Sequence, residues 1–210
     1  MKNTVDNNKV KIAGEIASDF RFSHEAYGEK FYILDVAVKR LSEYVDYVPV
    51  VVSERMMDVN KSYIGSTVCV SGRFRSFNLH ENGTSKLLLF VFAKELEIIS
   101  EVQGEKTNHI FLDGYICKQP VYRKTPLGRE ITDFLIATNR DYNKSDYIPC
   151  ISWGRNARYT SVLTPGTHIK ITGRIQSRNY LKTYDDGSTE GKIAYEVSVT
   201  TIEVVDHENE

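Results

Sequence analysis

The feature that most constrains this chain is an internal repeat. Residues 37–55 (AVKRLSEYVDYVPVVVSER) and 137–155 (ATNRDYNKSDYIPCISWGR) resemble each other at a constant offset of 100 positions, which becomes 101 further downstream. The coinciding pairs are Gly14/Gly114, Gly28/Gly128, Ala37/Ala137, Arg40/Arg140, Asp46/Asp146, Tyr47/Tyr147, Pro49/Pro149, Arg55/Arg155, Gly65/Gly166, Gly72/Gly173, Arg73/Arg174, Ser76/Ser177 and Asn78/Asn179. So many matches indicate a duplicated unit, and a chain of 210 residues has room for two domains.

Each copy has the pattern of a small β-rich domain. In the second copy, runs rich in β-branched and aromatic residues predict strands over 110–116, 130–138, 147–153, 167–180 and 194–205. The stretch GRNARYTSVL at 154–163 predicts a short helix, and Thr164-Pro165-Gly166 ends it. Gly114 interrupts the first run, where a glycine permits a bulge or a sharp bend.

The order of these elements predicts the fold class. A turn at 185–188 leads into the last strand, and the first copy repeats the order with a helix near 53–63 and a turn at 81–83. Three strands, one helix and two strands are the order of the OB-fold, a five-stranded Greek-key barrel. We therefore expect an all-β chain of two tandem OB-folds, over 1–103 and 107–206, with the polar stretch 100–107 (SEVQGEKT) as the linker.

Composition indicates a folded protein and its cellular compartment, but it does not decide the function. The chain is 41% hydrophobic and 26% charged, which suits a folded core, and it contains neither a run of about 18 apolar residues nor an apolar leader. Three scattered cysteines without a Cys-x-x-Cys pair argue against disulfides and zinc, so we expect the cytoplasm. The net charge is −1, but residues 107–205 carry 13 Lys/Arg against 10 Asp/Glu, so the second copy is the better candidate for a basic face.

The second copy resembles the bacterial single-stranded DNA-binding protein family over nearly its whole length. The resemblance is carried by LDGYI at 112–116, TPLG at 125–128, FLIATNR at 134–140, WGRNA at 153–157 and TGRIQSRNY at 172–180. The first copy resembles the family chiefly through its match to the second. The resemblance implies sequence-tolerant binding of single-stranded DNA in replication, recombination or repair, with no enzymatic activity and no cofactor.

The chain departs from the usual family member in three ways. The usual member has one barrel and forms a tetramer, so two barrels per chain imply a homodimer with four barrels. The family's long tail with an acidic tip is missing after the last strand, which puts recruitment of replication proteins through such a tip in doubt. Ser53 stands where the second copy has Trp153, so we expect the first barrel to bind less tightly.

A sequence-tolerant binder of single strands needs aromatic side chains that stack on bases, at about 1–3 kcal/mol each, interleaved with Arg and Lys for phosphates. By resemblance, Trp153 and Tyr180 occupy family stacking positions, and Tyr147 and Tyr142 match less closely. The candidate residues of the second copy are Tyr122, Arg140, Tyr142, Tyr147, Trp153, Arg155, Arg174, Arg178, Tyr180 and Lys182. The first copy has fewer candidate residues, which are Arg40, Tyr47, Arg73, Arg75 and Phe77.

Structural roles compete with binding roles for several of these residues. A single tryptophan in a small barrel is often part of the core, and tyrosines repeated in both copies, such as Tyr47, suit a fold role equally. Arg73 and Arg174 could hold a carboxylate within the barrel instead of a phosphate. Apolar strand runs predict that three phenylalanines belong to the core. These are Phe31, Phe90 and Phe92.

Two other functions compete with DNA binding. An enzyme is disfavoured because the sequence has no Gly-rich phosphate loop, nucleophile elbow or clustered metal ligands, and Asp185-Asp186 lies in a turn. A protein-interaction adaptor, similar to primosomal replication protein B with the same fold, stays open. Salt dependence separates it from a DNA binder, because phosphate binding releases counterions.

Overall fold

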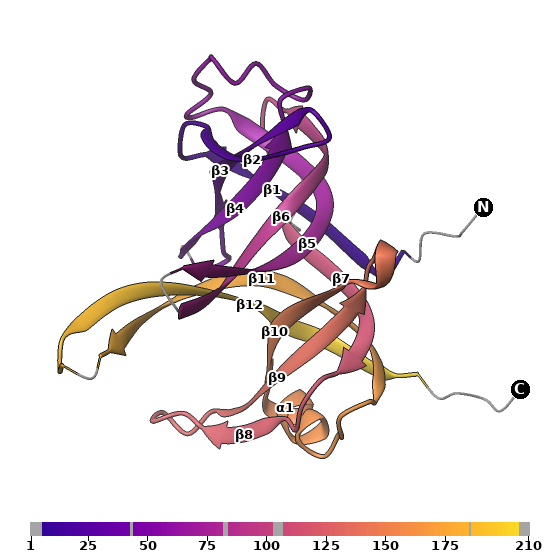
Figure 1. Cartoon of the computed structure of the whole chain (residues 1–210). Coiled ribbons are helices and arrows are strands. Elements are labelled where there is room, and N and C mark those ends of the chain that lie inside the picture. The colour runs from indigo at the N-terminus through magenta and orange to yellow at the C-terminus, as the bar shows by residue number, and fades with distance from the viewer. Residues whose placement is uncertain (1–5, 43, 82–83, 103–106, 185, 206–210) are drawn as a thin grey trace, which may run out of the picture.

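The computed structural model describes residues 6–42, 44–81, 84–102, 107–184 and 186–205. Within these ranges twelve strands form one continuous sheet, and Figure 1 shows it as two barrels, one above the other. The strands of the first barrel are β1 (Asn8–Ile16), β2 (Arg21–Ala26), β3 (Glu29–Lys39), β4 (Val45–Ser53), β5 (Thr67–Glu81) and β6 (Thr84–Ile98). The second barrel contains β7 (Asn108–Ile116), β8 (Val121–Lys124), β9 (Glu130–Asn139), the 3-10 turn η1 (Asp141–Asn143), β10 (Ser145–Trp153), α1 (Gly154–Ser161), β11 (His168–Thr183) and β12 (Thr189–Val204).

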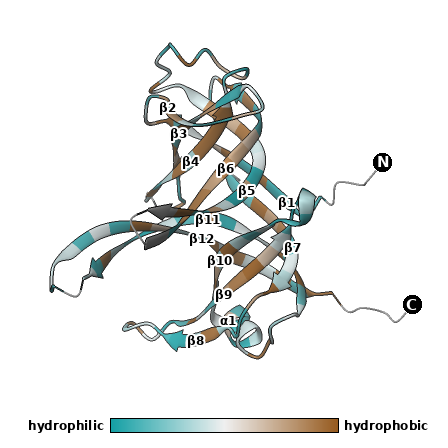
Figure 2. Ribbon diagram, viewed as in Figure 1, coloured by the Kyte–Doolittle hydropathy of each residue, from teal (hydrophilic) through white to brown (hydrophobic). Residues whose placement is uncertain are grey.

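Alternation of side chains along the strands builds both cores. Val10 and Ile12 of β1 are buried while Lys11 between them is exposed, and in β7 Ile110 and Leu112 are buried while Phe111 between them is half-buried. Figure 2 shows hydrophobic residues concentrated on barrel strands such as β4 and β9. Burial of these aliphatic side chains stabilises each barrel by about 1.5–3 kcal/mol per large residue.

Each barrel closes through its first strand. β1 pairs with β5 and, at its end, with β3, while β7 pairs with β11 and, at its end, with β9. The β4–β6 and β10–β12 pairs are parallel, and the other pairs are antiparallel. This is the strand arrangement of the OB-fold, so the predicted fold class is confirmed.

The repeated glycine of the first strands serves a close approach of backbones. A Cβ on Gly14 or Gly114 would lie 2.2 Å from the carbonyl oxygen of Ala37 or Ala137, respectively. Gly114 therefore sits where β7 turns from β11 to β9, and its pairing with Ile169 stays in register. The register shifts of the long strands lie instead before the glycines at 72 and 173.

The structure corrects two expectations about the elements. Each barrel has a sixth short strand, β2 or β8, which the sequence analysis missed because its side chains are mostly exposed. The helix α1 is confirmed, but the helix expected at 53–63 is wrong, because that segment forms turns. Gly154 begins α1 with a φ of 55, a conformation that favours glycine, whereas the equivalent position of the first copy is Glu54. Asp58 accepts a hydrogen bond from the backbone N–H of Asn60, which favours a local turn over a helix.

Three further expectations concern turns and boundaries. The turn expected at 81–83 lies largely outside the described residues. Of the linker predicted at 100–107, residues 103–106 also lie outside them. The turn at 185–188 is supported by a hydrogen bond from the Tyr184 N–H to the Ser188 carbonyl. The domain limits 1–103 and 107–206 stay a prediction.

The two barrels share a seam, which we define as the β1–β7 pairing and the side chains packed beside it. The two strands run antiparallel, with Val10 opposite Ile110 at the centre of the paired stretch. Because Val10 and Ile110 are equivalent positions of the duplicated unit, the barrels are related by an approximate two-fold axis at this point. The sheet therefore continues from one barrel into the other without an edge.

Two buried carboxylates reinforce the seam in a reciprocal way. Asp46 of the first barrel accepts hydrogen bonds from the Ser177 N–H (2.6 Å) and hydroxyl (2.9 Å) of the second. Asp146 of the second barrel accepts one from the Ser76 N–H (2.9 Å) of the first. Both aspartates are fully buried. Burial alone raises the pKa of the Asp46 carboxyl, but hydrogen bonds from Arg40 and Ser177 outweigh it, so that pKa lies below its ordinary value.

Candidate nucleic-acid interface

The outward face of β10 carries the aromatic candidates of the second barrel. Alternation directs Ile148 and Cys150 into the core, and it directs Tyr147 and Trp153 outward. Trp153 is 38% exposed, and its Nε1–H donates to the Ser198 hydroxyl of β12 at 3.2 Å. The indole is thus held at one edge on the surface, outside the barrel core.

Strand register places a cation on each side of this tryptophan. Directly paired residues point to the same face of a sheet, so the pairing defines a line of side chains across the five strands β8, β9, β10, β12 and β11. We call this line the outer row of the second barrel. It consists of Arg123, Ile131 and Trp153, followed by Ile151, Ser198 and Arg174. Arg123 was not among the candidate residues, because only the pairing of β8 brings it to this face, where it forms an ion pair with Asp133.

Arg174 is half-buried beside another guanidinium. Burial lowers its pKa, and the positive charge of Arg40 lowers it further. Because Asp46 neutralises the charge of Arg40, Arg174 supplies the net positive potential at this place on the seam. That potential favours an anionic ligand such as phosphate.

Tyr180 and Lys182 lie on a long arm formed by β11 and β12. Figure 1 shows this hairpin extending beyond the second barrel. Tyr180 is 38% exposed, and the Arg178 guanidinium lies 5.8 Å from its ring centroid. Arg178 also donates to Glu196 at 3.3 Å, and Lys182 lies 4.8 Å from the ring of Tyr184. Rings and cations therefore alternate along the arm.

Tyr47 and Tyr147 occupy equivalent places at the seam. The Tyr47 carbonyl accepts a hydrogen bond from the Tyr195 hydroxyl of the second barrel, and the Tyr147 N–H donates to the Ser76 hydroxyl of the first. Their rings are 52% and 46% exposed, respectively. The backbone of each tyrosine thus supports the seam, while its ring is free to contact a ligand.

Two arginine candidates are engaged in the seam. Arg40 binds both carboxylate oxygens of Asp46 at 2.6 Å and also donates to the Ser177 carbonyl at 2.8 Å. Arg75 forms an ion pair with Asp146 at 2.6 Å across the seam. These guanidinium groups neutralise buried carboxylates, so we do not retain them as phosphate contacts.

The other candidates of the second barrel are less closely grouped. Arg140 lies 3.4 Å from Asp146, and Tyr142 is 94% exposed in η1 at φ 62. Arg155 is exposed in the first turn of α1. Tyr122 is paired with the inward-facing Thr132 and donates to a glutamate of β9, so it lies on the other face of β8 from the outer row.

The outward face of the first barrel is more aromatic than expected. In β6 alternation directs Leu89 and Val91 into the core, which leaves Phe90 and Phe92 half-buried on the outside. Phe31 of β3 is likewise half-buried. The prediction that these three phenylalanines are core residues is therefore wrong, because the apolar runs alone did not show which face each side chain takes.

Arg73 and Phe77 are the remaining candidates of the first barrel. Phe77 is 55% exposed on β5. Arg73 is half-buried, and its Nε is buried without a hydrogen-bond partner among the described residues. The structural role considered for Arg73, a carboxylate partner within the barrel, is filled instead by Arg40, whereas Arg75 pairs with a carboxylate across the seam.

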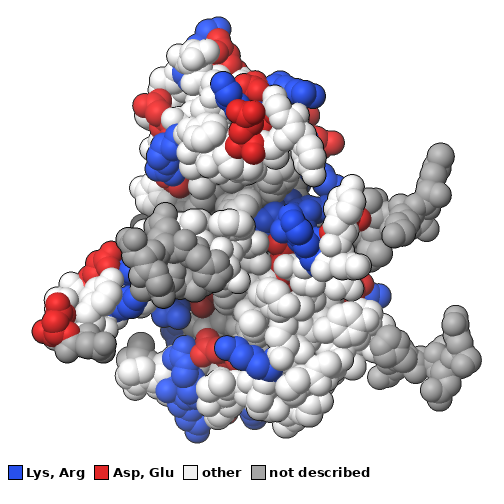
Figure 3. Space-filling view, viewed as in Figure 1, with Lys and Arg blue, Asp and Glu red and all other residues white. Residues whose placement is uncertain are grey.

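Charged residues on the face shown in Figure 3 are clustered in some places and mixed in others. Figure 3 shows Lys and Arg gathered near the β8 end of the second barrel and again between the barrels, whereas acidic and basic residues are mixed on the first barrel. The two positive areas lie on or beside the elements that carry the candidate residues.

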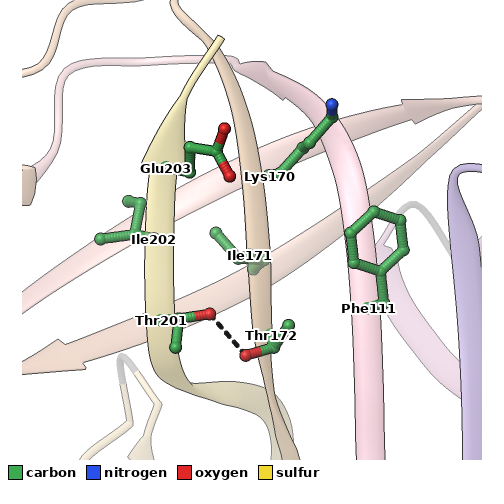
Figure 4. Close-up of a pocket in the computed structure, with 7 residues that line it drawn as sticks. All are labelled: Phe111, Lys170, Ile171, Thr172, Thr201, Ile202 and Glu203. Atoms are coloured by element: carbon green, nitrogen blue, oxygen red, sulfur yellow. Dashed lines mark hydrogen bonds between the residues drawn. The ribbon is translucent and has the colours of Figure 1, made fainter.

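The remaining features of the described residues are a pocket, the absence of grouped metal ligands and the absence of a membrane-spanning helix. One shallow pocket lies over β7, β11 and β12, where Thr172 and Thr201 share a hydrogen bond of 2.6 Å and Lys170 and Glu203 lie further along the same two strands (Figure 4). In the described part of the chain, no three His, Cys, Asp or Glu side chains are grouped to hold a metal. Nor does that part contain a helix of the length and hydropathy that a bilayer crossing requires.

Residues 107–205 match the model of the Single-strand binding protein family. This match covers the second barrel, which is a little less than half of the chain. The chain is 35% identical over 80 residues to Single-stranded DNA-binding protein 1 of Staphylococcus aureus (strain COL), which covers 35% of this chain and 48% of that relative. It is 34% identical over 80 residues to Single-stranded DNA-binding protein A of Bacillus subtilis (strain 168), with coverage of 35% and 46%. The chain thus spans about half the length of the curated relatives it matches.

A solved structure extends the likeness to both barrels. The crystal structure of the wild-type single-stranded DNA binding protein from Thermus aquaticus matches with a TM-score of 0.76, over 97% of this chain and 95% of that one, at 18% identity. This supports the fold of the tandem arrangement. The single-strand binding protein family match itself covers only the barrel that contains Trp153.

Proposed function

We propose that the chain binds single-stranded DNA with little dependence on sequence and without enzymatic activity, in replication, recombination or repair. The outer row of the second barrel carries the proposal. It presents the half-exposed ring of Trp153 with Arg123 and Arg174 each two strands away in the sheet, and Tyr180 follows on the arm. The names of the curated relatives support the same ligand.

The chemistry of this surface suits a ligand of flat rings and phosphates. Every base has a π-face, so stacking contributes about 1–3 kcal/mol per base whatever the sequence, and the cations neutralise the backbone. The proposed contacts are Tyr47, Arg73, Phe77, Arg123, Arg140, Tyr142, Tyr147, Trp153, Arg155, Arg174, Arg178, Tyr180 and Lys182.

A titration with oligo(dT) tests the proposal. Trp153 is the only tryptophan, so quenching of its emission on addition of oligo(dT) reports contact at one defined place. We expect quenching that saturates and an affinity that falls steeply with salt. An affinity that does not change between low and high salt would favour the adaptor function instead.

We further propose that the protein acts as a homodimer with four barrels in the cytoplasm. The pairing of two barrels in one chain supports this, because a single chain provides half of a four-barrel assembly. Light scattering should then give about 48 kDa, twice the chain mass of 24.0 kDa. A mass near 24 kDa with and without DNA would remove the dimer.

A further inference from the structure

The first barrel has its own version of the outer row. Cross-strand pairing gives a line of six side chains at the positions equivalent to those around Trp153, and we call it the outer row of the first barrel. It consists of His24, Phe31 and Ser53, followed by Val51, Phe92 and Arg73. A basic residue, His24 or Arg73, thus stands at each end, as Arg123 and Arg174 do in the second barrel.

The aromatic residues of the two rows occupy different strands. The second barrel places its ring at Trp153 on β10, between an isoleucine on β9 and Ser198 on β12. The first barrel has Ser53 at the position of the tryptophan but places Phe31 and Phe92 on the strands to either side. The ring missing from β4 is therefore replaced by two rings, one on each side of it.

These rings form a continuous aromatic surface. The centroids of Phe31 and Phe92 are 5.5 Å apart, and His24 stacks on Phe31 at 4.8 Å with an interplanar angle of 10°. Both phenylalanines are half-buried, and His24 is exposed. Outward faces of small barrels are ordinarily polar, so an aromatic line here points to a ligand with flat apolar faces.

The charges around the row suit a nucleic acid. Arg73 forms no ion pair within 4.0 Å among the described residues, so its charge is available to a phosphate. Glu29 is the nearby negative group to be considered; it accepts a hydrogen bond from Ser53 and lies 3.6 Å from Arg55. Arg55 therefore offsets the charge that would repel a phosphate.

We propose that Phe31, Phe92 and His24 form a second base-stacking platform, so that the first barrel binds single-stranded DNA through strands β2, β3 and β6. The inference rests on the proposed function and names the surface that the first barrel contributes to it. It revises the expectation, drawn from Ser53 and from the charge balance of the second copy, that the first barrel binds less tightly.

The first test removes the π-faces and keeps the apolar volume. In the full chain, the double variant Phe31→Leu/Phe92→Leu should bind long oligo(dT) at least about fivefold more weakly, the loss of one stacked base. The matched control is Phe22→Leu, because Phe22 is 61% exposed on the same hairpin but points to the other face. Equal affinity of the double variant and the wild type would overturn the inference while leaving DNA binding by the second barrel intact.

The second test does not depend on the stability of the double variant. A Phe31→Trp substitution in a Trp153→Phe background moves the only tryptophan to the proposed platform. Its emission should be quenched by oligo(dT), whereas a Phe22→Trp substitution in the same background should not respond. An unchanged emission of the Phe31→Trp variant at saturating oligo(dT) would reject the platform, and a wild-type chain that does not bind oligo(dT) at all would reject the proposed function itself.

Discussion

Replacing Trp153 with alanine should reduce both DNA binding and stability, by amounts that differ in cause. The lost stacking contact corresponds to about 1–3 kcal/mol, or about 5- to 150-fold in affinity for oligo(dT). The indole is partly buried and makes one hydrogen bond, to Ser198, so its removal should also destabilise the fold by about 2 kcal/mol. For a chain of this size that corresponds to a melting temperature lower by about 4–8 °C.

The assay measures both quantities on the same samples. Anisotropy of a dye-labelled oligo(dT) gives the affinity well below the melting temperature, and differential scanning calorimetry gives the stability. The variant Trp153→Phe keeps a π-face but cannot donate to Ser198, so it should retain most of the affinity and lose part of the stability. If Trp153→Ala is folded and binds oligo(dT) as the wild type does, the stacking role of Trp153 is wrong.

Three further predictions concern the phosphate contacts, the seam and the glycine contact. Lys182→Gln should reduce the slope of log affinity against log salt by about 0.7, measured by repeating the titration at several salt concentrations. The folded state lowers the pKa of Asp46 below its ordinary value of 3.8. The ionised carboxylate should therefore stabilise the fold fully above that pH, and this stabilisation should be lost as the pH falls through the folded-state pKa. In acid titrations, the unfolding free energy of Asp46→Asn should depend less on pH than that of the wild type. Gly114→Ala should cost about 3 kcal/mol, because the new Cβ would lie 2.2 Å from a carbonyl oxygen, whereas Gly191→Ala, with nothing within 4 Å, should leave the denaturant midpoint nearly unchanged.

Periodicity and repeat spacing predicted the barrel order and α1, because burial alternates in strands such as β1. They did not predict the role of Arg75, whose partner Asp146 lies 71 positions away and meets it only across the seam. They also misjudged Phe31 and Phe92. An apolar residue in an apolar run is compatible with either face of a strand, and only the register of neighbouring strands decides between them.

The two outer rows could not be predicted from the sequence for the same reason. Comparing the copies position by position showed Ser53 against Trp153 and indicated a loss. The compensating rings stand on other strands and become neighbours only after the sheet has formed. Position-by-position comparison therefore detects the substituted residue but not its replacement in space.

Under the proposed function, the seam also gives the bound strand a direction. Two identical barrels related by a true two-fold axis present the same surface to a strand read from either end. Here the halves are covalently joined and have diverged, so that one presents the indole of Trp153 and the other the rings of Phe31 and Phe92. A strand that crosses both barrels meets these platforms in one order from its 5′ end and in the opposite order from its 3′ end. On this proposal a single duplicated chain distinguishes the polarity of its ligand, which a symmetric pair of identical barrels cannot do.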